Sequence, residues 1–403
     1  MSKYIYIIAE YNPPHTGHRY MIDELRRRFG DDVTVICIMS GNFTERGSAA
    51  IANKYVRAKA ALFIGADLVL ALPFPWCASS AEYFARAGVS IATKLASALP
   101  ADEHILAFGS ESGDANTIKL VGARLASAEF RQKLASLPSA DRTARGIERT
   151  YGEIYKDGTE NLLTSPNNTL AVEYVRAVHE LDSCLTPVTV KRLGAAHDAK
   201  LLGLHPSASY LRDRICAGED VSDLVPDGAY RVLRDEFDAH GAARDENYGD
   251  ALLGSLRLIS PCAVDGLAEC AGGVGRRLIS AANSASTFAD ALTSAATKQY
   301  TNARLRRASV FAALGVTQSE LRALPEHTSV LAANEKGTLA LRSFSKRSSI
   351  EILTKSADAS SKLGTYALRQ FELDARSDAL YALAFRPHLP SDAFRRISPA
   401  IFK

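Results

Sequence analysis

The chain has 403 residues and a formal net charge of +3, and its content of 47% hydrophobic and 23% charged residues is typical of folded globular proteins rather than disordered or fibrous ones. No apolar run approaches the ~20 residues that span a bilayer, and no signal peptide precedes the first predicted strand, so we expect a cytoplasmic protein and neither a membrane-spanning nor a secreted one. The six cysteines include no Cys-x-x-Cys pair and predict neither disulfides nor structural zinc.

The first predicted elements are a strand, a tight loop and a helix. An apolar run at residues 4–8 predicts the strand, and apolar side chains at helical spacing over residues 19–29 predict the helix. Between them lies Ala-Glu-Tyr-Asn-Pro-Pro-His-Thr-Gly-His, in which two prolines delay the helix until His15. His15 and His18 then share the positive end of the helix, where free N–H groups attract anions. The stretch predicts a phosphate site; the alternative is a solvated turn with two incidental histidines.

Strands and helices then alternate as far as residue 193. Strands are predicted at 33–39, 67–72, 105–108 and 187–193, and helices at 49–64, 79–95, 114–126 and 168–181. This alternation predicts an α/β fold with a Rossmann-like parallel sheet, which binds ligands beyond the carboxyl ends of its strands. Polar residues at 15–18, 40–42 and 109–111 all follow predicted strands. No Walker A or Gly-x-Gly-x-x-Gly pattern follows the first strand, which argues against the commoner phosphate loops.

A second short motif, Ser207-Ala208-Ser209-Tyr210-Leu211-Arg212, follows His205-Pro206. Ser207 or Ser209 is suited to cap a helix, in whose first turn Arg212 would lie. By itself this pattern is typical of an ordinary helix start with a surface arginine.

Helical patterns follow over residues 226–240, 246–258, 263–297, 300–314 and 317–324, and a weak alternation of helix and strand comes after them. We therefore predict two domains, a nucleotide-binding domain at 1–215 and a mostly α-helical domain at 216–403. Residues 291–403 hold 17 Lys or Arg and 9 Asp or Glu, whereas residues 1–290 hold 31 and 36. A basic C-terminal third suggests a polyanionic partner, although a solvated face would look the same.

The His-x-Gly-His spacing resembles the signature of the nucleotidyltransferase superfamily, which includes adenylyltransferases and class I aminoacyl-tRNA synthetases. Residues 207–212 resemble its second signature, Ser-Ser/Ala-Thr-x-Ile-Arg, with Ser209 in place of Thr. This resemblance implies that His15 and His18 contact the phosphates of ATP during attack on the α-phosphorus. It also implies that Ser209 and Arg212 hold the β- and γ-phosphates, and that His15, His18 and Arg212 are catalytic.

A closer resemblance, in order along residues 5–315, is to the tRNA(Met) cytidine acetate ligase family. The motifs that carry it are Glu10-Tyr11-Asn12-Pro13, Met39-Ser40-Gly41-Asn42-Phe43, Arg46-Gly47, Gly65-Ala66-Asp67-Leu68-Val69, Ser80-Ala81-Glu82-Tyr83-Phe84-Ala85, Phe108-Gly109-Ser110-Glu111, Ser165-Pro166-Asn167-Asn168, Lys191-Arg192, His197-Asp198 and Thr297-Lys298-Gln299-Tyr300-Thr301. The family implies an enzyme that uses ATP to convert acetate to acetyl-adenylate. The acetyl group then passes to the wobble cytidine of elongator tRNA(Met), and AMP and pyrophosphate are released.

The resemblance also implies which residues bind each partner. ATP would be bound by Ile8, Ala9, Glu10, Tyr11, Asn12, Pro13, Pro14, His15, Thr16, Gly17, His18, Arg19, Tyr20, Met21, Gly109, Asn167, Arg192, Ser209 and Arg212. Candidate tRNA contacts are Lys54, Arg57, Lys298, Arg304, Arg306 and Arg307. For Lys54 and Arg57, a plain exposed helix face is an equal alternative. Mg²⁺ is expected with the ATP phosphates, and the sequence indicates no metal site made by the protein itself.

Four positions depart from the family pattern, at Pro14, Thr16, Asn53 and Tyr55, where Phe, Asn, Asp and Trp are usual. None of these changes removes a predicted phosphate ligand. Two other functions share part of the pattern. One is a small-molecule adenylyltransferase acting on a mononucleotide or phosphopantetheine, which would not need the basic C-terminal extension. The other is an RNA-binding module with a vestigial ATP fold, against which the intact His15, His18 and Arg212 argue.

Overall fold

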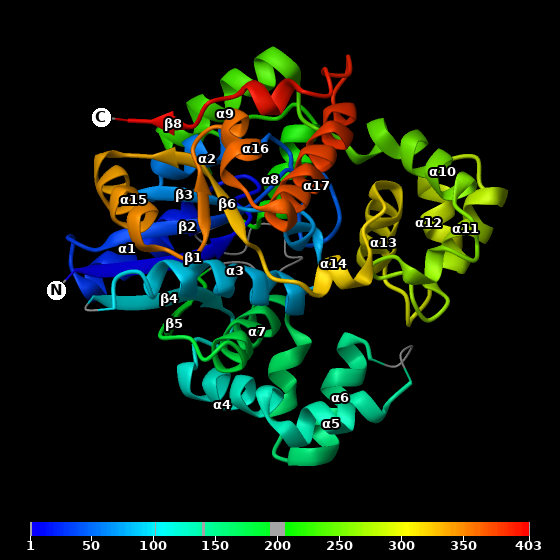
Figure 1. The fold of residues 1–403 in the computed structure, drawn as a ribbon, viewed down its shortest axis with the longest axis horizontal. Helices are drawn as coiled ribbons and strands as arrows, with labels where there is room; N and C mark the ends of the chain where they lie inside the picture. Colours follow the sequence, from blue (N-terminus) through cyan, green and yellow to red (C-terminus); the bar gives the residue numbers. More distant parts are fainter. Residues whose placement is uncertain (1, 101, 139–141, 194–205, 403) are drawn as a thin grey trace.

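A computed structural model describes residues 2–100, 102–138, 142–193 and 206–402 (Figure 1). Its described strands form one sheet in the order β5-β4-β1-β2-β3-β6-β7, with β8 paired to β6. The strands are β1 (Lys3–Ala9), β2 (Thr34–Ser40), β3 (Leu68–Leu72), β4 (Glu103–Ser110), β5 (Thr186–Lys191), β6 (His327–Ala333), β7 (Glu351–Leu353) and β8 (Ala400–Ile401). The first five strands are parallel, which confirms the predicted Rossmann-like α/β fold.

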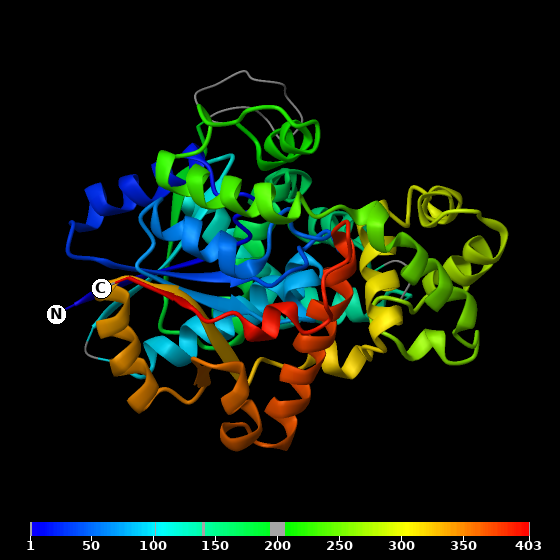
Figure 2. The same cartoon turned by 90° about the horizontal axis from the view of Figure 1, so that it is seen from above.

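Helices cover both faces of this sheet, as Figure 2 shows from above. In β1, Tyr4, Tyr6 and Ile8 belong to one apolar core, whereas Ile5 and Ile7 belong to another, as the alternation of a strand requires. The first core includes side chains of α3 (Ala81–Ala96) and α7 (Pro166–Glu180), and the second includes α1 (Thr16–Phe29), α2 (Lys54–Leu62) and α9 (Asp227–His240). The sheet is therefore the middle layer of three.

Two groups of helices extend from this core. One consists of α4 (Ala115–Ala126), α5 (Ala128–Ser136) and α6 (Ala144–Tyr155). The other consists of α10 (Gly249–Leu258), α11 (Val274–Ser284), α12 (Phe288–Ala295) and α13 (Asn302–Leu314), and has an apolar core of its own. In Figures 1 and 2 this second group lies beyond the end of the sheet opposite the N-terminus, and so faces the carboxyl ends of the parallel strands.

The last part of the chain returns to the sheet. After α14 (Gln318–Arg322), β6 pairs antiparallel with β3, and α15 (Glu335–Arg347), α16 (Ala359–Lys362) and α17 (Thr365–Tyr381) follow. The sequence indicated only a weak alternation of helix and strand after residue 324 and placed no strand there, so the positions of these strands are a finding of the structure. Strands from both sides of residue 215 share one sheet. The division of the chain at that residue stays a prediction. Across the described part of the chain, the helices are too short or too polar to cross a bilayer.

Candidate ATP-binding site

The loop after β1 brings two imidazoles to the N-terminus of α1. His15 is the N-cap residue, so helix α1 begins at Thr16. The sequence placed the earliest helical residue at His15, one position before this. His15 Nδ1 accepts a hydrogen bond from the backbone N–H of Gly17 at 3.0 Å, and His18 Nδ1 accepts one from the N–H of His15 at 3.2 Å. The ring centroids are 3.8 Å apart. Because both Nδ1 atoms are acceptors, each neutral ring carries its proton on Nε2 and presents that atom as a donor.

The protonation state of His18 follows from its surroundings. Desolvation by the surrounding protein, followed by the positive charge of Arg192, lowers the pKa of His18 to about 3. The ring of Tyr11 packs against the same imidazole in a T-shaped arrangement, with centroids 4.9 Å apart. At neutral pH His18 is therefore an uncharged hydrogen-bond donor, and it can bind an anion without first taking up a proton.

We expect the His18 resonances to stay in their neutral form in an NMR titration of the ligand-free protein from pH 8 to pH 5. The same histidine in urea-unfolded protein should titrate near pH 6.5, the ordinary value for histidine. Since the folded pKa is the lower one, stability contributed by this group is lost as the pH falls from about 6.5 towards 3. A His18→Gln variant assigns the resonance by its disappearance. A midpoint above pH 6 in folded protein would contradict the neutral-donor assignment.

The second motif meets the histidine loop directly. Helix α8 (Ala208–Cys216) begins after Ser207, whose hydroxyl accepts a hydrogen bond from the N–H of Tyr210 at 3.2 Å. Ser207 is thus the cap, which leaves Ser209 inside the first turn. Arg212 donates to the carbonyl of Asn12 at 2.9 Å and to the hydroxyl of Ser209 at 2.9 Å. Residues 200 positions apart in the chain therefore form one polar cluster at the end of β1.

The ends of β4 and β5 supply the remaining predicted ATP contacts. Gly109 pairs with Val190, and a Cβ atom at position 109 would lie 3.3 Å from Cγ of Arg192, so the stem of the arginine packs closely on this glycine. Glu111 accepts hydrogen bonds from the N–H and the side-chain amide of Asn167, at 3.2 and 2.6 Å. The loop after β4 is thereby joined to the start of α7. His197 and Asp198, which the sequence motifs included, lie outside the described residues.

Among the described residues, the structure contains no group of three or more His, Cys, Asp or Glu side chains placed to hold a metal ion. All six cysteines lie in the described ranges and are free thiols.

Comparison with known proteins identifies the family. A model of the HIGH nucleotidyl transferase family matches residues 2–394. The tRNA(Met) cytidine acetate ligase of Acetivibrio thermocellus is 30% identical, over 98% of this chain and 97% of the relative. This chain belongs to the tRNA(Met) cytidine acetate ligase family. The ligase of Thermoanaerobacter sp. is also 30% identical, over 94% and 95% of the two chains.

Solved structures of the family agree with the fold. The crystal structure of apo Thermotoga maritima TmcAL has a TM-score of 0.88 and 25% identity, and the match covers 99% of each chain. A second form of that protein, bound with alpha-thio ATP, has a TM-score of 0.86 at 24% identity and supports the fold alone.

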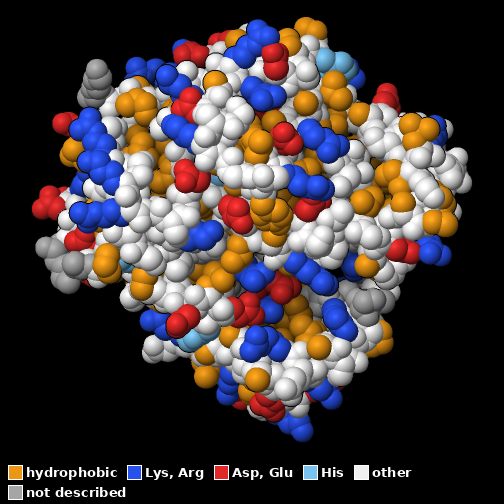
Figure 3. All heavy atoms as spheres, in the orientation of Figure 1, with side chains coloured by type: hydrophobic (Ala, Val, Ile, Leu, Met, Phe, Trp, Pro, Cys, Tyr) orange, Lys and Arg blue, Asp and Glu red, His pale blue; other side chains and the backbone are white. Residues whose placement is uncertain are grey.

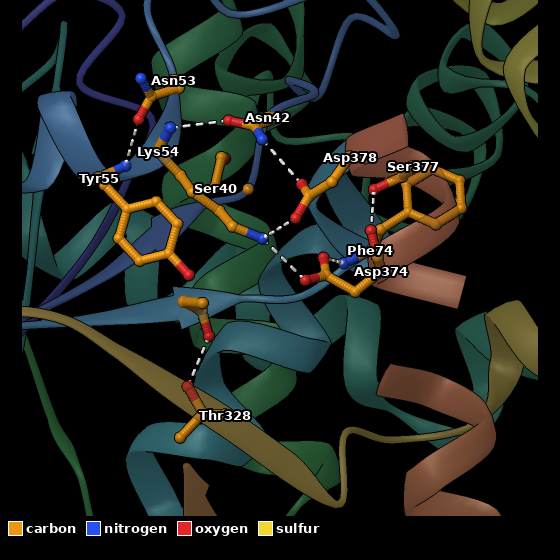
Figure 4. Close-up of polar contacts among 12 residues, drawn as sticks. Ser40, Asn42, Asn53, Lys54, Tyr55, Phe74, Thr328, Asp374, Ser377 and Asp378 are labelled. Carbon is orange, nitrogen blue, oxygen red and sulfur yellow. Dashed lines mark hydrogen bonds and ion pairs between the residues drawn. The ribbon is translucent and has the colours of Figure 1, made fainter. Parts of the chain in front are cut away.

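Lys54 and Arg57 are both buried, which argues against the tRNA contacts expected of them. Lys54 is only 4% exposed and forms ion pairs with Asp374 at 2.9 Å and Asp378 at 2.8 Å, both on α17 (Figure 4). Asn42 completes the cluster by donating to Asp378 at 2.7 Å and accepting from the N–H of Lys54 at 2.7 Å. Burial of a fully paired lysine argues against contact with RNA or phosphate.

Arg57 is fully buried and joins the ends of β1 and β2. Its guanidinium donates to the carbonyls of Glu10, Gly41 and Ser40, the last at 3.1 Å, and to that of Ala52 at 2.9 Å. Four carbonyl acceptors engage four of the five N–H donors of this buried cation, so Arg57 links the backbone of the loop after β1 to that of the loop after β2. The same burial argues against the tRNA contact expected of it.

The departure from the family at Asn53 has a local explanation. Asn53 caps α2 through its Oδ1, which accepts from the N–H groups of Tyr55 and Val56, as an aspartate would. Its amide nitrogen also donates to Glu236 at 2.6 Å, whereas an aspartate would repel that carboxylate. Asparagine at this position is therefore matched to Glu236 in this chain.

The four basic residues on and before α13 differ in exposure. Arg307 is buried and forms ion pairs with Glu269, at 2.8 Å, and Glu45, at 3.8 Å, which argues against the tRNA contact expected of it. Arg306 lies 3.8 Å from Asp245 and is partly exposed, Arg304 lies over the ring of Tyr300, and Lys298 is exposed. These last three stay candidates for RNA contact.

Proposed function

We propose that this protein activates acetate with ATP as acetyl-adenylate and transfers the acetyl group to the wobble cytidine of elongator tRNA(Met). The observation that supports it most strongly is the joining of the two superfamily motifs, in which Arg212 donates to Asn12 and Ser209 beside the paired imidazoles. The sequence matches to acetate ligases extend over nearly the full length of both chains, which favours the proposal over a small-molecule adenylyltransferase. We further propose that the enzyme works in the cytoplasm.

In the first step a carboxylate oxygen of acetate attacks the α-phosphorus of ATP, and the bond to pyrophosphate breaks. No protein nucleophile is needed, so catalysis depends on positioning and on stabilising the charge of the phosphate oxygens. His15 and His18 would donate through Nε2, while Arg212 with Ser209 would hold the β- and γ-phosphates. Mg²⁺ would neutralise phosphate charge and would be bound mainly through ATP itself.

The function is tested with purified protein, ATP, labelled acetate and bulk tRNA, each omitted in turn. Base-labile label on RNA that requires ATP and acetate would support the ligase. Adenylate formation without transfer to any RNA would restrict the proposal to its first half. If ATP binds but neither product forms with acetate, the proposed substrate is wrong.

We propose that the exposed face around α13 binds the tRNA phosphates. Lys298, Arg304 and Arg306 lie on the helical group that faces the carboxyl ends of the strands (Figure 1). Phosphate contacts of this kind supply affinity and position without reading the base sequence.

The charge-reversal variant Lys298→Glu/Arg304→Glu should bind tRNA more weakly and reduce the slope of log K against log salt by about one for each phosphate that is no longer neutralised. Formation of acetyl-adenylate should be unaffected. The matched control is Lys346→Glu/Arg347→Glu, which makes the same charge change on α15, where Figure 3 shows basic side chains gathered. Filter binding at several salt concentrations measures both. Equal loss of affinity in the two variants would show a general charge effect and count against this face.

A further inference from the structure

The second half-reaction of the proposed function requires a proton acceptor. The exocyclic N4 of cytidine attacks the carbonyl carbon of acetyl-adenylate, a C–N bond forms, and the C–O bond to AMP breaks. The attacking nitrogen must lose one proton as this happens, and its lone pair is delocalised into the ring, so it is a weak nucleophile. A positioned general base typically accelerates such a step by about 10²–10⁴-fold.

The two histidines of the ATP loop are unsuited to this role. Nδ1 of His15 and Nδ1 of His18 already accept hydrogen bonds from backbone N–H groups, so each ring presents a protonated Nε2. A ring in this tautomer donates through Nε2, and it cannot take up a proton at Nδ1 while that atom accepts a hydrogen bond. The base must therefore be a different group.

Most carboxylates at this edge of the sheet are already engaged. Both oxygens of Glu111 accept N–H groups from the start of α7. Asp245 accepts from a backbone N–H and a tyrosine hydroxyl at one oxygen and faces an arginine with the other. The side chain of Glu45 pairs with Arg307. Within the described residues, Glu10 receives one hydrogen bond on its carboxylate, from the N–H of Glu45 to Oε1 at 2.8 Å, which leaves Oε2 without such a bond.

The position of Glu10 fits an acceptor between ATP and the tRNA. Glu10 directly follows β1 and is half-buried. The guanidinium of Arg57 donates a hydrogen bond to the backbone carbonyl of Glu10. Oε1 of Glu10 accepts its hydrogen bond from the loop that follows β2. This loop packs closely on α13, because a Cβ atom at Gly47 would lie 2.6 Å from the backbone nitrogen of Arg307. One oxygen of Glu10 is thus oriented by the element that adjoins the proposed tRNA-binding helix, while the loop that follows Glu10 carries the two histidines.

We propose that Oε2 of Glu10 accepts the N4 proton of the cytidine as the C–N bond forms, which makes Glu10 a catalytic residue of acyl transfer. The carboxylate becomes a carboxylic acid, the electron pair of the broken C–O bond stays on the AMP phosphate, and the proton then passes to solvent. This role rests on the proposed function, because it requires an amine acceptor.

The test isolates the transfer step. Wild-type and Glu10→Gln proteins are loaded with synthetic labelled acetyl-adenylate, the bound amount is measured, and tRNA is added in a single turnover. The rate per loaded site should fall by about 10²–10⁴-fold in Glu10→Gln. The wild-type rate should rise with pH to a plateau with the ionisation of one carboxylic acid, and this dependence should be absent in Glu10→Gln. Glu10→Asp should keep the pH dependence at a reduced rate.

Asp213→Asn, which changes an exposed carboxylate on the helix of Arg212, is the matched control and should transfer at the wild-type rate. A Glu10→Gln rate within threefold of wild type, or an unchanged pH dependence, would overturn the proposal. A Glu10→Gln protein that cannot be loaded would place Glu10 in nucleotide binding and overturn it as well. If loaded wild-type protein acetylates no RNA, the proposed function itself is wrong, and the role proposed for Glu10 is wrong with it.

Discussion

Replacing His18 with Ala is expected to slow acetyl-adenylate formation by about 10²–10³-fold, the effect of removing one donor to developing charge. The reason is that His18 is neutral, with a pKa lowered to about 3, and presents Nε2–H at the helix terminus where the phosphates are proposed to lie. Acetate-dependent exchange of pyrophosphate into ATP measures this step without tRNA. The matched control is His240→Ala, at an exposed histidine at the end of α9, which should leave exchange unchanged.

A structural effect of the same substitution has to be separated from the catalytic one. His18 also accepts from the N–H of His15, and loss of such a capping bond typically costs about 1 kcal/mol of stability. Thermal unfolding should therefore change by only a few degrees, and the assays are made well below the transition. Exchange at more than a third of the wild-type rate in folded His18→Ala protein would remove His18 from the proposed mechanism.

Replacing Arg307 with Met is expected to destabilise the protein by about 3–5 kcal/mol, because two carboxylates would lose the cation that lies between them. Arg307 is buried, Glu269 lies 2.8 Å from it and Glu45 lies 3.8 Å from it. Burial is the largest cause of the raised pKa of Glu45, and the nearby carboxylates Glu10 and Glu269 raise it further, whereas Arg307 lowers it. Urea unfolding followed by circular dichroism measures the loss.

Arg304→Met is the control, because this side chain lies one turn earlier on α13, is partly exposed and lies over the ring of Tyr300. Its loss should cost under about 1 kcal/mol, as is usual for exposed charges. If Arg307→Met kept the wild-type stability and only weakened tRNA binding, the side chain would be a tRNA contact after all, as its place in a basic segment first suggested.

The sequence predicted the parts of the site that depend on local order. The strand, proline-containing loop and helix around His15 and His18 follow from periodicity and proline chemistry, and the helix start at Ser207 follows from capping preferences. The meeting of Arg212 with Asn12 was expected only because both motifs resemble one superfamily. Spacing within either motif does not predict a contact across 200 residues.

The buried charges could not be predicted in the same way. Lys54 and Arg57 lie three residues apart on a short helix, a spacing that an exposed face and a buried face share. The partners of Lys54 are Asp374 and Asp378, more than 300 residues later in the chain, so no local pattern distinguishes this lysine from a surface one. Strand β6 could not be located within the weak alternation after residue 324 for a related reason, because its pairing with β3 is decided by tertiary contact.

The pairing of β6 with β3 has a consequence for synthesis on the ribosome. Strand β3 leaves the ribosome early, but its neighbour in the sheet, residues 327–333, is made much later, and the aspartates that pair with Lys54 later still. Until then the nascent chain carries an open apolar strand edge, which favours association with other chains. A ribosome that stalls within the α10–α13 region would therefore release a fragment that needs chaperones or proteolysis, even though its ATP loop is complete.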